Sequence, residues 1–90
     1  MSVTQGDFPS LATILTMAGR VWQVELVGDY EYDMLTVDVH LASGDQKIGP
    51  FQFGGEGFVD REELPFAADI VQQLEAVIYQ LMAKHWPLDF

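Results

Sequence analysis

Residues 20–41 read RVWQVELVGDYEYDMLTVDVHL, and this stretch predicts the centre of the fold. Apolar and polar side chains alternate from position 20 to position 27, which is the two-residue period of a strand with one buried face. The apolar positions are Trp22, Val24 and Leu26, and Gln23 and Glu25 lie between them. We therefore expect a strand over residues 20–27 that covers a core with one face.

A second strand is expected to run back to about residue 41. Gly28-Asp29 fits a two-residue hairpin turn with glycine at its first central position. The buried side of the second strand is then Leu35, Val37, Val39 and Leu41, and the opposite side is Thr36, Asp38 and His40. This register also turns Glu31 and Asp33 towards the buried side, where unpaired carboxylates are costly. Either the hairpin end projects beyond the helices, or residues 30–33 form a wider loop; both arrangements leave the acids exposed.

Turn residues at 42–45 separate the second strand from a third, expected over 46–53. Gly49-Pro50 interrupts its alternation, which predicts a bulge and an edge position, because proline cannot donate to a ladder. The glycine-rich segment 54–57 is expected to be a flexible connector.

Two helices are predicted at the ends of the chain. Residues 7–18 fit a short helix with Asp7 as its cap, Pro9 in its first turn and Gly19 at its exit. Its apolar stripe is Phe8, Leu11, Ile14, Leu15 and Ala18.

The second helix is expected to start at Pro65 and to stop before Pro87. Its apolar stripe is Phe66, Ala67, Ile70, Val71, Leu74, Val77, Ile78, Leu81 and Met82, and Asp69, Gln72, Gln73, Glu75 and Gln80 lie off it. The tail from His85 to Phe90 could insert into a hydrophobic pocket on another protein, but we expect it to fold back over its own core.

The order of elements is helix, three antiparallel strands, helix. We therefore expect a single α+β domain over residues 1–90. Its architecture would be a two-layer α-β-β-β-α sandwich with both helices on one face of a three-stranded antiparallel sheet.

The charge of the chain restricts its partners. Four Lys or Arg stand against fourteen Asp or Glu, a net charge of −10. Such a surface repels phosphate, so we expect no direct binding of nucleic acid or of a membrane, and attraction to basic protein surfaces. The absence of Cys, of a basic leader and of a long apolar run predicts a cytoplasmic protein, in the host cytoplasm if it is phage-encoded.

No motif for a cofactor, a metal or catalysis is found. The GGEG segment at 54–57 lacks the lysine of a phosphate-binding loop. Asp29, Glu31 and Asp33 have the spacing of a calcium loop, but Met34 and His40 stand where that loop needs Gly and Glu. The serines suit local hydrogen bonds, and no nucleophile is signalled near His40. We therefore predict that the protein is not an enzyme.

Carboxylates concentrate in two windows of the sequence. Ten of the fourteen lie in residues 25–38 and 56–69, five in each window. In the first, tyrosines alternate with acids, and tyrosine is a favoured interface residue. The candidate partner-binding residues are Asp29, Tyr30, Glu31, Tyr32 and Asp33, together with Glu56, Asp60, Glu62 and Glu63.

These features favour a small acidic inhibitor that occupies the basic, nucleic-acid-binding surface of a partner protein. In size and acidity the chain is similar to phage-encoded anti-defence inhibitors of the anti-CRISPR and anti-restriction type, a likeness of composition alone. One alternative is an immunity protein for a basic toxin. Another is a structural or assembly subunit, such as a phage particle component, that self-associates through the strand holding Ile48, Phe51 and Phe53.

Overall fold

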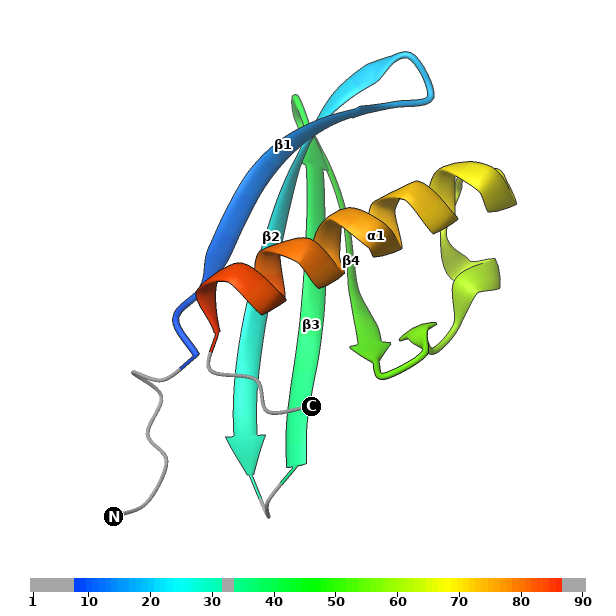
Figure 1. The fold of residues 1–90 in the computed structure, drawn as a ribbon. Coiled ribbons are helices and arrows are strands. Elements are labelled where there is room, and N and C mark those ends of the chain that lie inside the picture. The colour runs from blue at the N-terminus through cyan, green and yellow to red at the C-terminus, as the bar shows by residue number, and fades with distance from the viewer. Residues whose placement is uncertain (1–7, 32–33, 87–90) are drawn as a thin grey trace.

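The computed structural model describes residues 8–31 and 34–86, which form one antiparallel sheet and one long helix (Figure 1). The five strands lie side by side in the order of the sequence. They are β1 (Leu11–Met17), β2 (Arg20–Glu31), β3 (Met34–Ser43), β4 (Gln46–Gly54) and β5 (Gly57–Phe58). A short 3-10 helix, η2 (Arg61–Glu63), precedes α1 (Ala68–His85).

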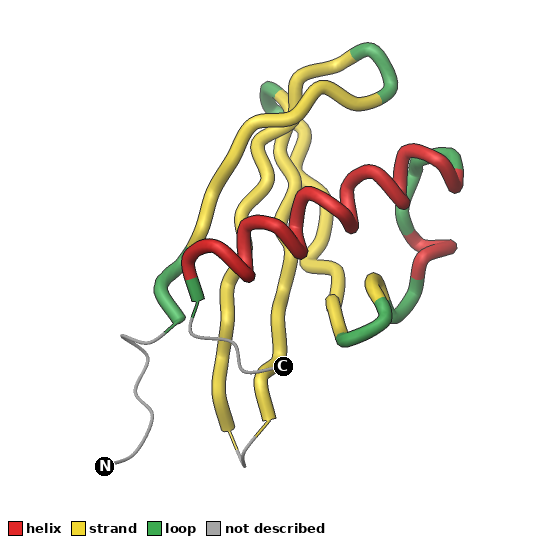
Figure 2. The backbone as a smooth tube through the Cα atoms, in the orientation of Figure 1, coloured by secondary structure: helices red, strands yellow, loops and turns green. Residues whose placement is uncertain are grey.

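The sheet curls into a half-barrel, and α1 crosses one of its faces (Figure 2). Nearly all buried side chains lie between these two layers. The core consists of Phe8, Met17, Trp22, Val24, Leu26, Val37, Val39, Leu41, Phe51, Phe53, Phe58, Leu64, Val71, Leu74, Ile78, Met82 and Trp86. The expected α-β-β-β-α sandwich with three strands and two helices is therefore wrong.

The main error concerns residues 7–18, which were expected to form a helix. Residues 11–17 instead form β1 and pair with residues 20–26 of β2. Thr13, Ile14 and Thr16 are β-branched and favour a strand. Gly19 has the expected left-handed conformation, with φ 75°, but it shares a hairpin turn with Ala18, whose φ is 52°. Two consecutive positive φ values are typical of the tight turns that join twisted strands.

The faces of β2 and β3 are as predicted, but their turn lies further along the chain. Trp22, Val24 and Leu26 are buried, and Val21, Gln23 and Glu25 beside them are exposed. The ladder passes through Gly28 and ends at the pair Glu31–Met34, so Gly28-Asp29 is not a turn. All of the second strand's predicted buried residues are buried or half-buried.

Trp86 explains the glycine at position 28. A Cβ atom on Gly28 would lie 3.0 Å from Cη2 of Trp86, so the position admits no larger residue without a shift of the ring. Glycine is needed here for close packing rather than for a turn.

The third predicted strand is confirmed as β4. The register between β3 and β4 shifts between Val39 and Leu41, opposite Gly49-Pro50. This shift is the predicted bulge. The segment 54–57 is not a loose connector, because Gly54 pairs with Gly57 across a tight turn.

The helix α1 begins at Ala68, three residues after the expected start at Pro65. The preceding connector still contributes to the core: Phe66 packs edge-on against Trp22, with ring centroids 5.4 Å apart. The predicted stripe is confirmed at its centre, where Leu74 and Ile78 are fully buried. Glu75, expected off the stripe, is also buried.

Candidate functional site: the outer face of the sheet

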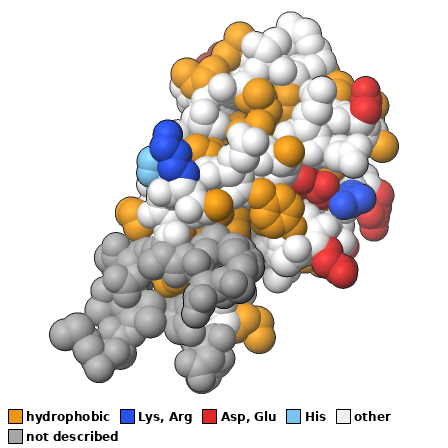
Figure 3. Space-filling view, viewed as in Figure 1, with side chains coloured by type: hydrophobic (Ala, Val, Ile, Leu, Met, Phe, Trp, Pro, Cys, Tyr) orange, Lys and Arg blue, Asp and Glu red, His pale blue; other side chains and the backbone are white. Residues whose placement is uncertain are grey.

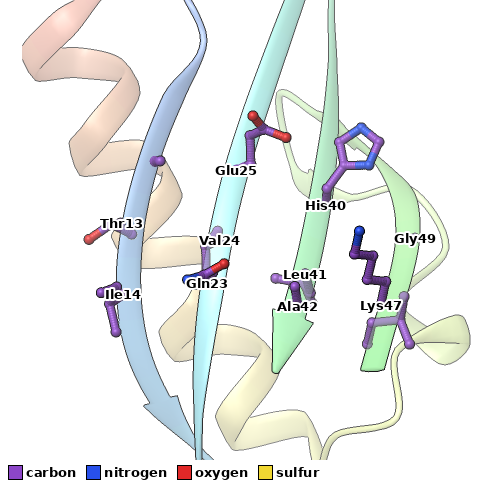
Figure 4. A pocket seen from close by; sticks show the side chains of 12 residues that line it. Thr13, Ile14, Gln23, Val24, Glu25, His40, Leu41, Ala42, Lys47 and Gly49 are labelled. Carbon is purple, nitrogen blue, oxygen red and sulfur yellow. The ribbon is translucent and has the colours of Figure 1, made fainter. Parts of the chain in front are cut away.

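The face of the sheet opposite α1 is uncovered by any helix or strand of residues 8–31 and 34–86. Figure 4 views this outer face with α1 behind the sheet. Glu25 on β2, His40 on β3 and Lys47 on β4 point towards the viewer, whereas Val24 and Leu41 point back into the core. Alternation along β2 and β3 therefore determines which charged groups share this face.

Three exposed carboxylates lie together on the outer face of the β2–β3 hairpin. We call Glu25, Asp29 and Asp38 the acidic row. Asp38 stands directly opposite Val27, which lies midway between Glu25 and Asp29. Asp38 is thus a diagonal neighbour of both, and the Cα atoms of diagonal neighbours in an antiparallel sheet are about 7–8 Å apart. None of the three carboxylates has a hydrogen bond or ion pair with another described residue.

The other end of the outer face is less acidic. A shallow depression of about 1010 Å³ lies there, with Ile14, Gln23 and Lys47 among its lining residues. Lys47 pairs with Ala42 towards the β3–β4 turn, away from Asp38 and Asp29. Glu25 also lines this depression, so the outer face carries Lys47 and Glu25 at this end, whereas Asp29 and Asp38 lie further towards the β2–β3 turn.

His40 lies in this depression, directly opposite Glu25 on β2. Asp38, its neighbour two positions earlier on β3, does not line the depression. No hydrogen bond joins His40 to either carboxylate, and the lining includes no serine. Ser43, the nearest serine along β3, is buried. Among the described residues, no hydrogen bond therefore links His40 to a hydroxyl group.

The structure places the predicted residues of the first window only in part. Asp29 is exposed on the outer face. Tyr30 and Glu31 end β2, paired with Leu35 and Met34 of β3. Tyr32 and Asp33 lie outside the described residues. Glu25 and Asp38 were counted in the window but not chosen as candidate site residues, although alternation from Asp29 along both strands could have found them.

The second predicted cluster lies at the β4–β5 turn and η2. We call Glu56, Asp60, Glu62 and Glu63 the loop acids, and all four are exposed. In Figure 3 most of the visible acidic side chains gather on the right-hand side, where β4, β5 and η2 lie. Arg61 lies among them, but its guanidinium pairs with the buried carboxylate of Glu75. The loop acids therefore receive little compensation from this cation.

Within residues 8–31 and 34–86, no group of three or more His, Asp and Glu side chains is arranged to hold a metal ion. Of the helical segments in the same ranges, none combines the length and the apolar character that a membrane crossing requires.

Comparisons of the chain with protein-family models, with curated proteins and with solved structures give no significant match. The chemistry of its own surfaces is therefore the basis for a functional assignment.

Proposed function

We propose that this protein is a small acidic binding protein whose acidic row docks on a basic surface of a partner protein. The partner would be a nucleic-acid-binding protein, and occupation of its basic surface would inhibit it. The supporting observation is that Glu25, Asp29 and Asp38 are exposed together on an uncovered sheet face, and that none of them forms an ion pair with a described residue.

The free energy of such an arrangement favours a cationic partner. Carboxylates at diagonal cross-strand positions, about 7–8 Å apart, repel one another, so the row is a small cost to the isolated fold. Lys and Arg side chains of a partner would remove that cost and gain charge-assisted hydrogen bonds. The net charge of −10 would also speed the encounter at low ionic strength.

An acidic row on a rigid sheet is suited to imitate a nucleic-acid backbone. Both present regularly spaced anionic oxygens to the same Lys and Arg side chains, so one should displace the other. A phage anti-defence inhibitor of the anti-CRISPR or anti-restriction type fits this mode of action. An immunity protein for a basic nuclease toxin would use the same chemistry, and a toxin gene beside this one would favour that alternative.

The assembly-subunit alternative has less support in its expected form. This alternative predicts self-association through Phe51 and Phe53, but both side chains are buried in the core between the sheet and α1. In addition, β5 pairs with the last residues of β4, where Phe53 lies opposite Phe58. That part of the sheet offers little apolar surface for self-association.

The proposal is tested by capture and displacement. The immobilised chain is incubated with cell lysate in low salt and then eluted with double-stranded DNA or with an uncharged polymer of similar size. We expect DNA alone to release a basic protein. With that protein purified, Glu25→Gln/Asp29→Asn/Asp38→Asn should weaken binding at least about tenfold and flatten its salt dependence.

A matched control separates a specific site from general charge. Asp60→Asn/Glu62→Gln/Glu63→Gln removes the same number of charges from the loop acids and should weaken binding much less. Equal weakening by both triple variants, or unchanged binding by the acidic-row variant, would contradict the proposal.

A further inference from the structure

The β1 edge of the sheet is open, whereas the opposite edge is protected. On its outer side, β1 pairs with no strand among the residues described, so its backbone N–H and C=O groups there are available for another strand. At the opposite edge, β4 carries Pro50 and a bulge, and β5 is only two residues long. Proline, bulges and short strands are the usual protection against edge-to-edge pairing, and β1 has none of them.

The sequence of β1 is suited to pairing. Leu11–Met17 reads LATILTM, without a charged residue or a proline, in a chain that has fourteen acids. Ile14, at its centre, is 67% exposed on the outer face. Val21, across the hairpin and diagonal to Ile14, is 59% exposed. An uncharged edge next to exposed apolar side chains is a typical site for strand addition.

We propose that a second copy of this chain adds its own β1 antiparallel to this edge, with the two Ile14 residues facing each other on a two-fold axis. In this register Leu11 faces Met17 of the other copy, and Thr13 faces Leu15, all on the covered face. Ala12 faces Thr16 on the outer face. Each residue pair across the interface therefore occurs twice, once in each direction, as a two-fold interface requires.

The pairing matches the burial pattern as well as the register. Leu11 and Leu15 are half-buried in one chain and would be covered further by Met17 and Thr13 of the second copy. Because residues opposite each other sum to an even number, the covered faces of both sheets stay on the same side. The two sheets would join into one, with both helices on one face.

Electrostatic repulsion between two copies is weaker at the β1 edge than at the acidic surfaces of the chain. No like charges oppose each other along β1, although each chain carries −10. The remaining long-range repulsion is screened by salt, so self-association should strengthen as salt is added. Binding to a basic partner has the opposite salt dependence, which separates the two interactions.

The test is sedimentation equilibrium of the full chain between about 1 and 500 µM, in about 50 mM and 500 mM NaCl. A single strand pair lies at the small end of specific interfaces, below about 1,200 Å², so we expect a micromolar dimer that is tighter in high salt. In the same samples, amide hydrogen exchange in β1 should slow as the concentration rises, because only the dimer protects the edge.

Ile14→Lys places two like charges at the two-fold axis and should weaken the dimer at least about tenfold. Val59→Lys is the matched control, since Val59 is 57% exposed and does not belong to β1. Both sites are exposed, so both variants should retain the wild-type circular dichroism. A monomeric wild type over the whole range, or a dimer unaffected by Ile14→Lys, would overturn the proposal.

Discussion

The guanidinium of Arg61 holds the carboxylate of Glu75 at two points, with Nε 2.9 Å from Oε2 and Nη2 3.1 Å from Oε1. Glu75 is only 6% exposed, and its Oε2 also accepts a hydrogen bond from the backbone N–H of Phe58 at 2.9 Å. One buried side chain of α1 thus fixes both β5 and η2. The position of the loop acids depends on this contact.

Replacement of Arg61 should destabilise the fold more than its exposed position suggests. Arg61→Ala leaves the Glu75 carboxylate buried with one backbone donor, and we expect a loss of about 1–3 kcal/mol in the free energy of unfolding. Urea titration measures this loss. Lys84→Ala, which removes an exposed cation at the end of α1, should change stability by no more than about 0.5 kcal/mol.

The double variant Arg61→Ala/Glu75→Gln distinguishes a buried charge from lost packing. A neutral amide is less costly to bury than an unpaired carboxylate, and its oxygen can still accept the Phe58 N–H. We therefore expect the double variant to be more stable than Arg61→Ala alone. If it is less stable, the ion pair does not account for the loss.

Gly57 should be intolerant of substitution because of its close approach to Glu75. Its φ is 102°, and a Cβ at this position would overlap the Glu75 carboxylate. Gly57→Ala should cost about 1–3 kcal/mol from backbone strain alone, and more from displacement of Glu75. Gly55→Ala, where a Cβ would meet nothing within 4 Å, should change the urea midpoint little.

The end of α1 is held to the start of β1 by Trp86. Its indole Nε1 donates to the backbone oxygen of Pro9 at 2.7 Å, and its ring packs edge-on against Phe8 and over Gly28. Trp86→Phe should cost about 1–2 kcal/mol, because it loses the hydrogen bond but keeps a ring. Trp86→Ala should cost about 3–5 kcal/mol, because it leaves a cavity. Equal losses in thermal unfolding would contradict this division.

Neutralisation within the acidic row should stabilise the isolated protein. Asp38→Asn removes the carboxylate that lies diagonal to Glu25 and Asp29, and we expect a gain of about 0.2–1 kcal/mol at low ionic strength. The gain should shrink in about 0.5 M salt, where screening is strong. Asp45→Asn, in the β3–β4 turn, is the control and should give a smaller gain. Thermal denaturation at two salt concentrations checks both variants.

The sequence predicts the faces of β2, β3 and α1 because periodicity is a local property. Each buried position in those segments can be recognised from residues two to four places away. The turn after Val27 is misplaced for the opposite reason, since Gly28-Asp29 has the local composition of a hairpin turn. The role of Gly28 depends on Trp86, 58 positions later, and no local pattern reports that contact.

The residues expected to form the first helix show how two periodicities can conflict. Phe8, Leu11, Ile14 and Leu15 fit a helical stripe, whereas the strand turns its odd positions, including Thr13, towards the covered face, where they are half-buried or buried. A polar threonine on the covered face conceals the two-residue period. The concentration of β-branched residues was the signal that favoured a strand.

The candidate site could be predicted as a region but not as a surface. The two acidic windows are visible in the sequence. Which acids of one face are neighbours depends on where the β2–β3 hairpin turns, and the misplaced turn concealed that Asp38 lies beside Glu25 and Asp29. The ion pair of Glu75 and Arg61 was not predicted either. Glu75 follows Leu74 on the helix, and no local pattern indicates that its partner lies fourteen residues earlier in the chain.

The hydrogen bond from Trp86 to Pro9 joins residues 77 positions apart in the chain. These two regions can therefore be joined by a short peptide while the chain is opened at a hairpin turn, for instance at Gly44-Asp45 between β3 and β4. The resulting circular permutant would begin with β4 and α1 and end with the β1–β2–β3 meander. It would keep every strand intact while changing the order in which they are synthesised.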